Sequence, residues 1–371
     1  MSNRQPVFDY YPRGTPVIMS ERMEQAMEEA IAAGAGAGAA NDAIENEMVR
    51  QLRDDPEYRS ALREAYETAG VTLVSPTMGS LDTNLTYPEG VRQDLTRWQA
   101  RIDAVDWFEK ATTPAEARSI VERGNVGVVL NVQNLGAALE GDAAEVDRLY
   151  DAGVRIAQLT YNSSNLVGTG CTERIDAGLT NHGVEVVDRC HDREMVVDLS
   201  HCGKATTLDA IEVSGRPVAI THAFAQSLAD HDRGKSKEEL AALADVDGYL
   251  GILTVPFFLD PGNQNADFDL VFDHVDYAVE HLGIDRVGIG TDWGSWTPEV
   301  PEPIREGIRA AFSTMGFREE HGVEVGVGFD TMQRYEDWQV IPDGLADRGY
   351  DESERAKLLG ENLLSFWERA T

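Results

Sequence analysis

The chain has 371 residues, 42% of them apolar, which is enough for one large α/β domain or two ordinary ones. Aspartate and glutamate number 65 against 32 lysines and arginines, and the net charge of -33 argues against nucleic acid or an anionic membrane as a partner. Three cysteines fit a reduced compartment, and no run of about 18 apolar residues occurs, so the sequence predicts a cytoplasmic protein without a membrane span.

Short apolar segments alternate with amphipathic segments along most of the chain. Most of the apolar segments lack a polar face, which is typical of parallel strands covered on both sides. Eight strands with helices between them predict an α/β protein, a (β/α)₈ barrel of the TIM type. The predicted strands are residues 6–11, 71–77, 126–134, 155–161, 195–201, 217–222, 248–255 and 286–292, and the predicted helices are 91–110, 143–152, 178–193, 205–214, 237–244 and 268–282.

Two segments exceed what such a barrel needs. Residues 20–70 form a highly acidic, helical stretch between the first two predicted strands, and residues 303–371 form a helical extension after the last strand. No linker with a shift in composition separates either segment from the rest. The sequence therefore predicts a single domain, residues 1–371, with an N-terminal helical insertion and C-terminal helices.

Polar side chains close several of the predicted strands. His201 ends the segment MVVDLSH and His222 ends PVAITH, and a helix connects the two. Parallel strands joined in this way end on the same side of a sheet, so both imidazoles are expected at one rim. Asp292 closes the last strand at the same rim. Imidazole binds zinc and similar divalent ions, and an aspartate can be a ligand or a general base, so the pattern indicates a metal-assisted or acid–base site.

The motifs LNVQN, LTYNSSN, VDLSH, ITHA and IGTD, with GENLL near the end, resemble the renal (membrane) dipeptidase family of the amidohydrolase superfamily from about residue 126 to residue 366. In that family a (β/α)₈ barrel holds two zinc ions that activate a bridging water for dipeptide hydrolysis. The resemblance implies that His201 and His222 bind the more buried metal and that Arg233 holds the substrate carboxylate. It also implies that Asp292 binds the other metal and takes a proton from the water. Family members are often dimers, so a homodimer is expected.

Three positions depart from the family pattern. The family opens with aspartate, glycine and a His-x-Asp pair; aligned on Asp9, Tyr11 stands where the ligand histidine should be and Arg13 where the ligand aspartate should be. Gln133 replaces a bridging glutamate and Tyr161 replaces a histidine that contacts the reacting carbonyl. A neutral amide bridges two dications poorly and a guanidinium repels a cation. We therefore expect that the two-metal site is not intact.

The first of three functions that remain open is a dipeptidase-type hydrolase of a small amide or dipeptide with a free carboxylate. One zinc or similar ion would be held by His201, His222 and the Gln133 side-chain carbonyl. Asp292 would move the proton, and Tyr161 would donate a hydrogen bond to the oxyanion. We expect Arg233 and Asn162 to contact the substrate.

The second function is a metal-free or altered site for a small amine or amino-acid derivative. In it Arg13 would occupy the space of the first metal, and Tyr11 and Tyr161 would add polar contacts to the substrate. The third is a binding protein without catalysis that keeps the old pocket. Cys171, in the loop after the fourth strand, also stays open as a ligand or nucleophile.

Overall fold

The computed structural model describes the chain apart from residues 1–3, 35, 80–84, 263–265, 294–301 and 324–327. The pairings between its strands are parallel throughout the described residues, in the ladders β1-β2-β5-β4 and β11-β10-β9-β8-β7-β6-β3. The strands are β1 Phe8–Asp9, β2 Leu73–Val74, β3 Thr77–Met78, β4 Phe108–Lys110, β5 Val126–Val128, β6 Leu130–Val132, β7 Val154–Gln158, β8 Val196–Asp198, β9 Ala219–Ala223, β10 Tyr249–Ile252 and β11 Val287–Ile289.

The two ladders are parts of one closed sheet. Leu73 pairs with Gly127 and Thr77 with Asn131, so the register does not change between β2–β5 and β3–β6. At the other end of the sheet the backbone N–H of Asp292 donates to the carbonyl of Tyr10 at 2.9 Å, which joins the segment after β11 to the segment after β1. Counting β2 with β3 and β5 with β6, and leaving out β4, which pairs with β5 alone, eight strand positions close the sheet. The predicted (β/α)₈ barrel is confirmed.

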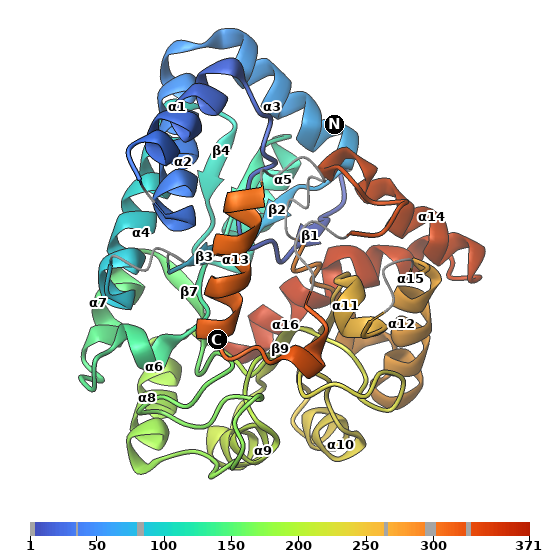
Figure 1. Cartoon of the computed structure of the whole chain (residues 1–371). Coiled ribbons are helices and arrows are strands. Elements are labelled where there is room, and N and C mark those ends of the chain that lie inside the picture. The colour runs from blue at the N-terminus through green and yellow to red at the C-terminus, as the bar shows by residue number, and fades with distance from the viewer. Residues whose placement is uncertain (1–3, 35, 80–84, 263–265, 294–301, 324–327) are drawn as a thin grey trace.

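Helices surround the sheet (Figure 1). Three of them, α1 Glu21–Ala32, α2 Ala37–Asp54 and α3 Pro56–Ala69, lie in the acidic segment between β1 and β2. The others that follow strands are α4 Tyr87–Ala104, α5 Pro114–Glu122, α6 Leu135–Ala138, α7 Glu145–Asp151, α8 Asn181–Asp192, α9 Lys204–Ser214, α10 Lys237–Asp245, α11 Pro256–Leu259 and α12 Asp269–Leu282. The C-terminal region contains α13 Glu302–Thr314, α14 Val340–Asp347, α15 Glu352–Ala356 and α16 Asn362–Ala370, with the short turns η1 Ile284–Arg286, η2 Glu319–His321, η3 Tyr335–Gln339 and η4 Lys357–Glu361. That the whole chain is one domain stays a prediction.

Local sequence signals set the ends of several helices. The Ser20 side chain accepts from the third residue of α1, and the Asp55 side chain accepts from the first turn of α3. Gly70 ends α3 with φ 73°, a left-handed conformation that favours glycine. Ser236 and Glu239 form a reciprocal capping box at the start of α10. This last cap matters for the site, because α10 begins where a buried loop returns from the barrel rim.

One helix ends earlier than predicted. The segment 91–110 was expected to be helical throughout, but α4 stops at Ala104 and Phe108–Lys110 forms β4, parallel to β5. Val105 already has an extended backbone, with φ -137°. The Phe108 ring packs edge-on against Tyr66 at 5.5 Å, so tertiary packing decides the conformation of a segment whose apolar spacing resembled a helix.

The closed sheet is held at its amino-terminal end by the last helix. Phe366 and Trp367 of α16 are buried in the same cluster as Phe8 and Ile156 of the barrel. Asn362 donates from its amide to the carbonyl of Val287 at 2.7 Å, which fixes α16 to the start of β11. The last helix therefore closes the end of the barrel opposite the polar strand ends. Removing one of its aromatic rings from this core would cost about 3–5 kcal/mol of unfolding free energy.

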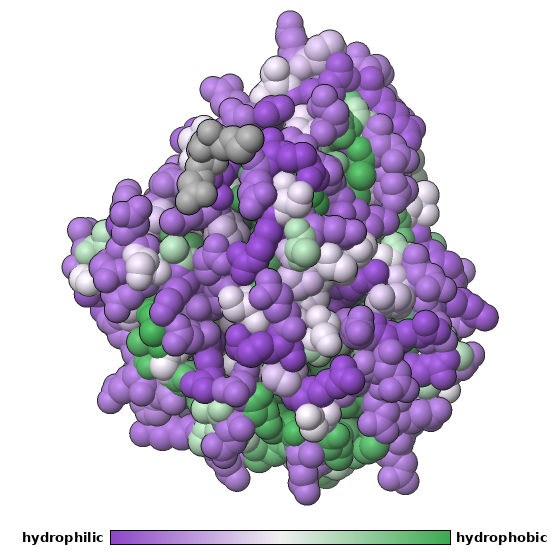
Figure 2. Space-filling view, turned by 180° about the vertical axis from the view of Figure 1, so that it is seen from behind, coloured by the Kyte–Doolittle hydropathy of each residue, from purple (hydrophilic) through white to green (hydrophobic). Residues whose placement is uncertain are grey.

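The surface agrees with the composition. The face shown in Figure 2 is largely hydrophilic, with apolar side chains gathered towards the lower edge of that view. Among the described residues, none of the helices combines the length and the apolar character that crossing a bilayer demands.

Candidate active site

Three predicted residues meet at the carboxyl ends of the strands. His201 lies just after β8, His222 lies in β9 and Asp292 lies just after β11. One potential ligand atom from each side chain lies within 4.8 Å of the others. The Nε2 atoms of the two imidazoles are 3.1 Å apart. β8 and β9 are neighbours in the sheet, which is why the two histidines face each other.

Hydrogen bonds assign the proton on each imidazole to Nδ1. His201 Nδ1 lies 2.7 Å from the amide oxygen of Asn162, which can only accept. His222 Nδ1 lies 2.8 Å from the hydroxyl of Thr221, and that hydroxyl donates its one proton to Asp198 at 2.6 Å. The Thr221 oxygen therefore accepts from His222. Both Nε2 lone pairs then point at each other without a proton between them, an arrangement that a cation stabilises.

Asp198 organises the rear of the site and was not identified from the sequence. Its carboxylate accepts from the hydroxyls of Ser200 and Thr221, each at 2.6 Å, and from both of their backbone N–H groups at 3.1 and 3.0 Å. Burial raises the pKa of Asp198, and these four hydrogen bonds oppose that shift. The signal was present in VDLSH, where an acidic residue stands within an apolar strand just before the ligand histidine.

Asp292 has the features of a functional carboxylate. Its φ is 50°, in the left-handed region that a non-glycine residue rarely adopts, and its backbone bond to Tyr10 helps to hold it there. Burial raises the pKa of Asp292 to about 7, with the nearby Arg233 lowering it and the carboxylates of Asp9 and Asp198 raising it. A carboxyl group that titrates near neutral pH can both take up and return a proton.

Two tyrosine rings stack on the two histidines. The ring of Tyr161 lies 4.0 Å from that of His201 at an interplanar angle of 21°. The ring of Tyr10 lies 4.5 Å from that of His222 at 17°, and its hydroxyl donates to Asn131 at 2.8 Å. Tyr10 is fully buried and fills the β1 side of the site. It was not among the residues predicted from the sequence.

Tyr11 takes a different position from the one expected. Its ring is fully buried and packs against Tyr335 at 5.2 Å and Trp293 at 5.7 Å, and its hydroxyl donates to the carbonyl of Thr15 at 3.1 Å. Successive side chains along an extended segment point to opposite sides, so Tyr10 faces the histidines and Tyr11 faces away. The structure gives no support to a substrate contact from Tyr11.

Arg13 is also placed differently from the expectation. Its guanidinium bonds to the Glu45 carboxylate at 2.8 Å and to the Asn41 side chain at 2.6 Å, both on α2. None of its contacts within the described chain reaches Asp292. The positive charge is matched by the helical segment, so Arg13 does not take the place of a first metal.

The remaining predicted residues lie around the histidines with unused donors. Arg233 is fully buried and donates to the carbonyls of Ser200 and His222, while its Nε has no partner among the described residues. The side-chain nitrogens of Asn162 and Gln133 also lack partners within that part of the chain. An unpaired buried donor costs about 1–3 kcal/mol, so these three groups favour water or a ligand with acceptor oxygens.

The thiols take no part in the histidine–aspartate cluster. Cys202 is buried and accepts from the Thr160 hydroxyl at 3.3 Å, and Cys171 contacts the Asn162 side chain at 3.5 Å. Burial raises the pKa of the Cys171 thiol to about 11, which disfavours the reactive thiolate. A nucleophilic role for Cys171 gains no support.

Known proteins resemble this chain in sequence and fold. Residues 89–305 match the family model for membrane dipeptidase, peptidase family M19. An uncharacterized dipeptidase of Schizosaccharomyces pombe is 26% identical over 249 residues, which is 66% of this chain and 54% of the relative. A dipeptidase of Clonostachys rogersoniana is 27% identical over 186 residues, 49% of this chain and 47% of the relative. The chain thus spans about half the length of the curated relatives it matches.

Solved structures share the barrel. An amidohydrolase from Pseudomonas aeruginosa superposes with a TM-score of 0.72 at 27% identity, over 84% of this chain and 92% of that one. A metallo peptidase from Rhodobacter sphaeroides, liganded with a phosphinate mimic of the dipeptide L-Ala-D-Ala, superposes with a TM-score of 0.70 over 99% and 100%. Its identity of 17% supports the fold alone. With more than half of its residues matched by the family model, the chain belongs to the membrane dipeptidase family, peptidase family M19.

Proposed function

We propose that this chain is a hydrolase of the dipeptidase type that uses one divalent metal ion, zinc being the first candidate. Its substrate would be a small amide or dipeptide with a free carboxylate. The observation that carries the proposal is the pair of Nε2 lone pairs, 3.1 Å apart, with the Asp292 carboxylate beside them. Uncharged imidazoles in this arrangement repel each other unless a cation lies between them and the carboxylate.

The donor set fits such an ion. Two imidazoles and one carboxylate are three protein ligands, the number that a catalytic zinc site uses while it keeps one position open. Burial, reinforced by the positive charge of Arg233, holds the pKa of both histidines well below the usual range, so both stay neutral, as ligands must be. When bound, the ion would supply a Lewis acid for a carbonyl or for water.

The protein side chains supply proton transfer and orientation. Asp292 would take a proton from the attacking water and return it to the leaving amine. Burial raises the pKa of Tyr161, so its phenol stays protonated and can donate to the developing oxyanion. Arg233 places a buried positive charge near Asp292 and Tyr161, and its unpaired Nε is a donor for a substrate carboxylate.

The surroundings favour one ion rather than two. On the β1 side the Tyr10 ring lies against His222, and among the described residues the cluster of potential metal ligands consists of His201, His222 and Asp292. Gln133, the predicted third ligand, is neutral, and Arg13 is bound to α2. The hypothesis of a metal-free site required the Arg13 guanidinium beside Asp292. Because Arg13 bonds to α2 instead, that hypothesis loses its support.

Metal analysis together with turnover tests the proposal. The purified chain is stripped with a chelator, reloaded with zinc, cobalt or manganese, and assayed for bound ion and for hydrolysis of a dipeptide panel. We expect one ion per chain and turnover that requires it. His222→Ala should lose both, whereas His182→Ala, on an outer helix, should lose neither. No bound ion after loading, with turnover indifferent to chelator, would refute the proposal; bound ligand without turnover would favour a binding protein.

Two broader properties are part of the same proposal. We infer a homodimer from the family resemblance and a cytoplasmic location from composition. Light scattering of the purified chain and fractionation of its source cells test them. A monomer at working concentration, or recovery in the membrane or secreted fraction, would contradict them.

A further inference from the structure

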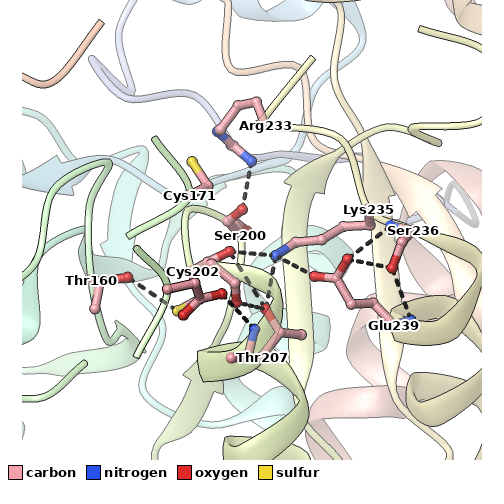
Figure 3. Close-up of polar contacts among 12 residues, drawn as sticks. Thr160, Cys171, Ser200, Cys202, Thr207, Arg233, Lys235, Ser236 and Glu239 are labelled. Atoms are coloured by element: carbon pink, nitrogen blue, oxygen red, sulfur yellow. Dashed lines mark hydrogen bonds and ion pairs between the residues drawn. The ribbon is translucent and has the colours of Figure 1, made fainter. Parts of the chain in front are cut away.

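The loop between β9 and α10 brings a buried lysine behind the active-site histidines. Lys235 is only 2% exposed, and its ammonium donates to the carbonyl of Cys202 at 2.9 Å and to the hydroxyl of Thr207 at 3.0 Å (Figure 3). It also pairs with the Glu239 carboxylate at 3.2 Å. All the acceptors of this cation are therefore protein groups behind the metal site.

Glu239 is fixed in turn by the start of α10. Its carboxylate accepts from the backbone N–H and the hydroxyl of Ser236, each at 2.8 Å, in the capping box described above. Glu239 is 3% exposed. Taking such a pair out of water costs several kcal/mol per ion, and the surrounding hydrogen bonds must offset that cost. Two apolar side chains of similar size would stabilise the loop as well as this ion pair does. Stability of the loop alone therefore does not explain why Lys235 and Glu239 are buried here.

The hydrogen bonds of two buried cations reach the residues on either side of His201. Arg233, on the same loop, donates to the carbonyl of Ser200 at 2.5 Å, and Lys235 donates to the carbonyl of Cys202. Ser200 and Cys202 are the immediate neighbours of His201 in the chain. Arg233 thus holds the peptide group that precedes His201, and Lys235 holds the peptide group that follows Cys202, the next residue along the chain. The second Arg233 bond, to the carbonyl of His222 at 2.8 Å, ties the other histidine to the same loop.

We propose that Lys235, held by Glu239, is a positioning residue that fixes the direction in which His201 presents its Nε2 to the metal. The inference rests on the proposed metal site. Arg233 is placed to contact substrate as well, whereas Lys235 faces away from it, towards Thr207 of α9. A substitution of Lys235 should therefore change the orientation of His201 without removing a contact to the substrate.

The test compares Lys235→Met with Lys237→Met, the same change on an exposed lysine two residues later. The probe is Co²⁺ alone, with its affinity measured by chelator competition and its ligand geometry by visible absorption. Lys235→Met should weaken Co²⁺ binding by about 10–100-fold, the range for partners that orient metal ligands, and should change the spectrum. Lys237→Met should match the wild type in both.

Lys235→Met leaves the Glu239 charge buried and unpaired, so this variant can fail to fold. Two further variants distinguish a loss of metal affinity from a loss of folding. The double variant Lys235→Met/Glu239→Leu removes both charges, and Thr207→Val removes one acceptor of the ammonium with little change of shape. Both of these variants should lose Co²⁺ affinity, by about 3-fold or more for Thr207→Val, while their metal-free melting temperatures stay near that of the wild type, since neither leaves a buried charge unpaired. Wild-type affinity and spectrum in any folded variant would overturn the inference and leave the proposed function standing. Failure of the wild type to bind Co²⁺ would overturn both.

Discussion

Replacing Asp198 by asparagine should move the proton on His222. The Oδ1 atom of Asp198 accepts three hydrogen bonds, two of them from backbone N–H groups, so the asparagine oxygen will keep that position. The amide nitrogen must then take the place of Oδ2, which accepts the Thr221 hydroxyl at 2.6 Å. There it becomes a donor to Thr221, whose own proton turns towards His222 Nδ1 at 2.8 Å. The imidazole proton moves to Nε2 and blocks the metal-binding lone pair.

The size of the effect follows from the role of such partners. Loss of a group that sets the tautomer of a ligand histidine weakens metal binding by about 10–100-fold, or about 1.4–2.7 kcal/mol. The exchange keeps the shape of the side chain, so the barrel should fold. Some loss of stability is expected as well, because hydrogen bonds to a charged acceptor contribute about 1.5–3 kcal/mol each.

Competition with a chelator measures the zinc affinity, and nitrogen NMR of the imidazole measures which ring nitrogen carries the proton. The wild-type apoprotein should show His222 protonated at Nδ1 and the Asp198→Asn protein should show it protonated at Nε2. Asp188→Asn, on an exposed part of α8, is the matched control and should leave both unchanged. An Asp198→Asn protein with wild-type zinc affinity and an unchanged tautomer would refute the reasoning about the hydrogen-bond chain.

Three more predictions follow from single side chains. Tyr10→Phe keeps the ring on His222, so the zinc count should stay at one per chain while urea denaturation shows a loss of about 1 kcal/mol for the missing hydroxyl bond; a second ion would contradict this. Burial raises the pKa of Asp9 from 3.8 to about 6, so folded protein retains its proton over that window and loses stability as the pH rises through it. Asp9→Asn should therefore gain about 3 kcal/mol relative to wild type between pH 4 and pH 8, and a pH-independent difference would be evidence against it. Arg13→Ala should leave KM within about 3-fold and cost at most about 1 kcal/mol of unfolding free energy, since Arg13 forms a partly exposed ion pair with Glu45; a tenfold rise in KM would restore it as a substrate contact.

The barrel could be predicted because buried parallel strands leave a strong pattern. Long apolar runs between helical segments marked all eight strand positions, and the strand-end rule brought His201, His222 and Asp292 to one rim. The strand Phe108–Lys110 was missed because it is short and continues the apolar spacing of α4, and only its pairing with β5 distinguishes it.

The finer details of the site depended on contacts that one sequence does not encode locally. Alignment on Asp9 directed attention to Tyr11, but the direction of each side chain after β1 is set by closure of the sheet through Tyr10. Arg13 finds its carboxylate on α2, within a segment that lies outside the family motifs. The role of Lys235 could not be predicted from its neighbours in the sequence, because its partners lie on α9, on α10 and in the turn after β8.

We propose that His201, His222 and Asp292 hold one catalytic metal ion. Anomalous diffraction from crystals loaded with zinc would locate that ion. We expect a single strong peak at about 2.0–2.2 Å from Nε2 of both histidines and from a carboxylate oxygen of Asp292. Two peaks in the barrel mouth, or a fully loaded crystal with no peak between these three side chains, would contradict it.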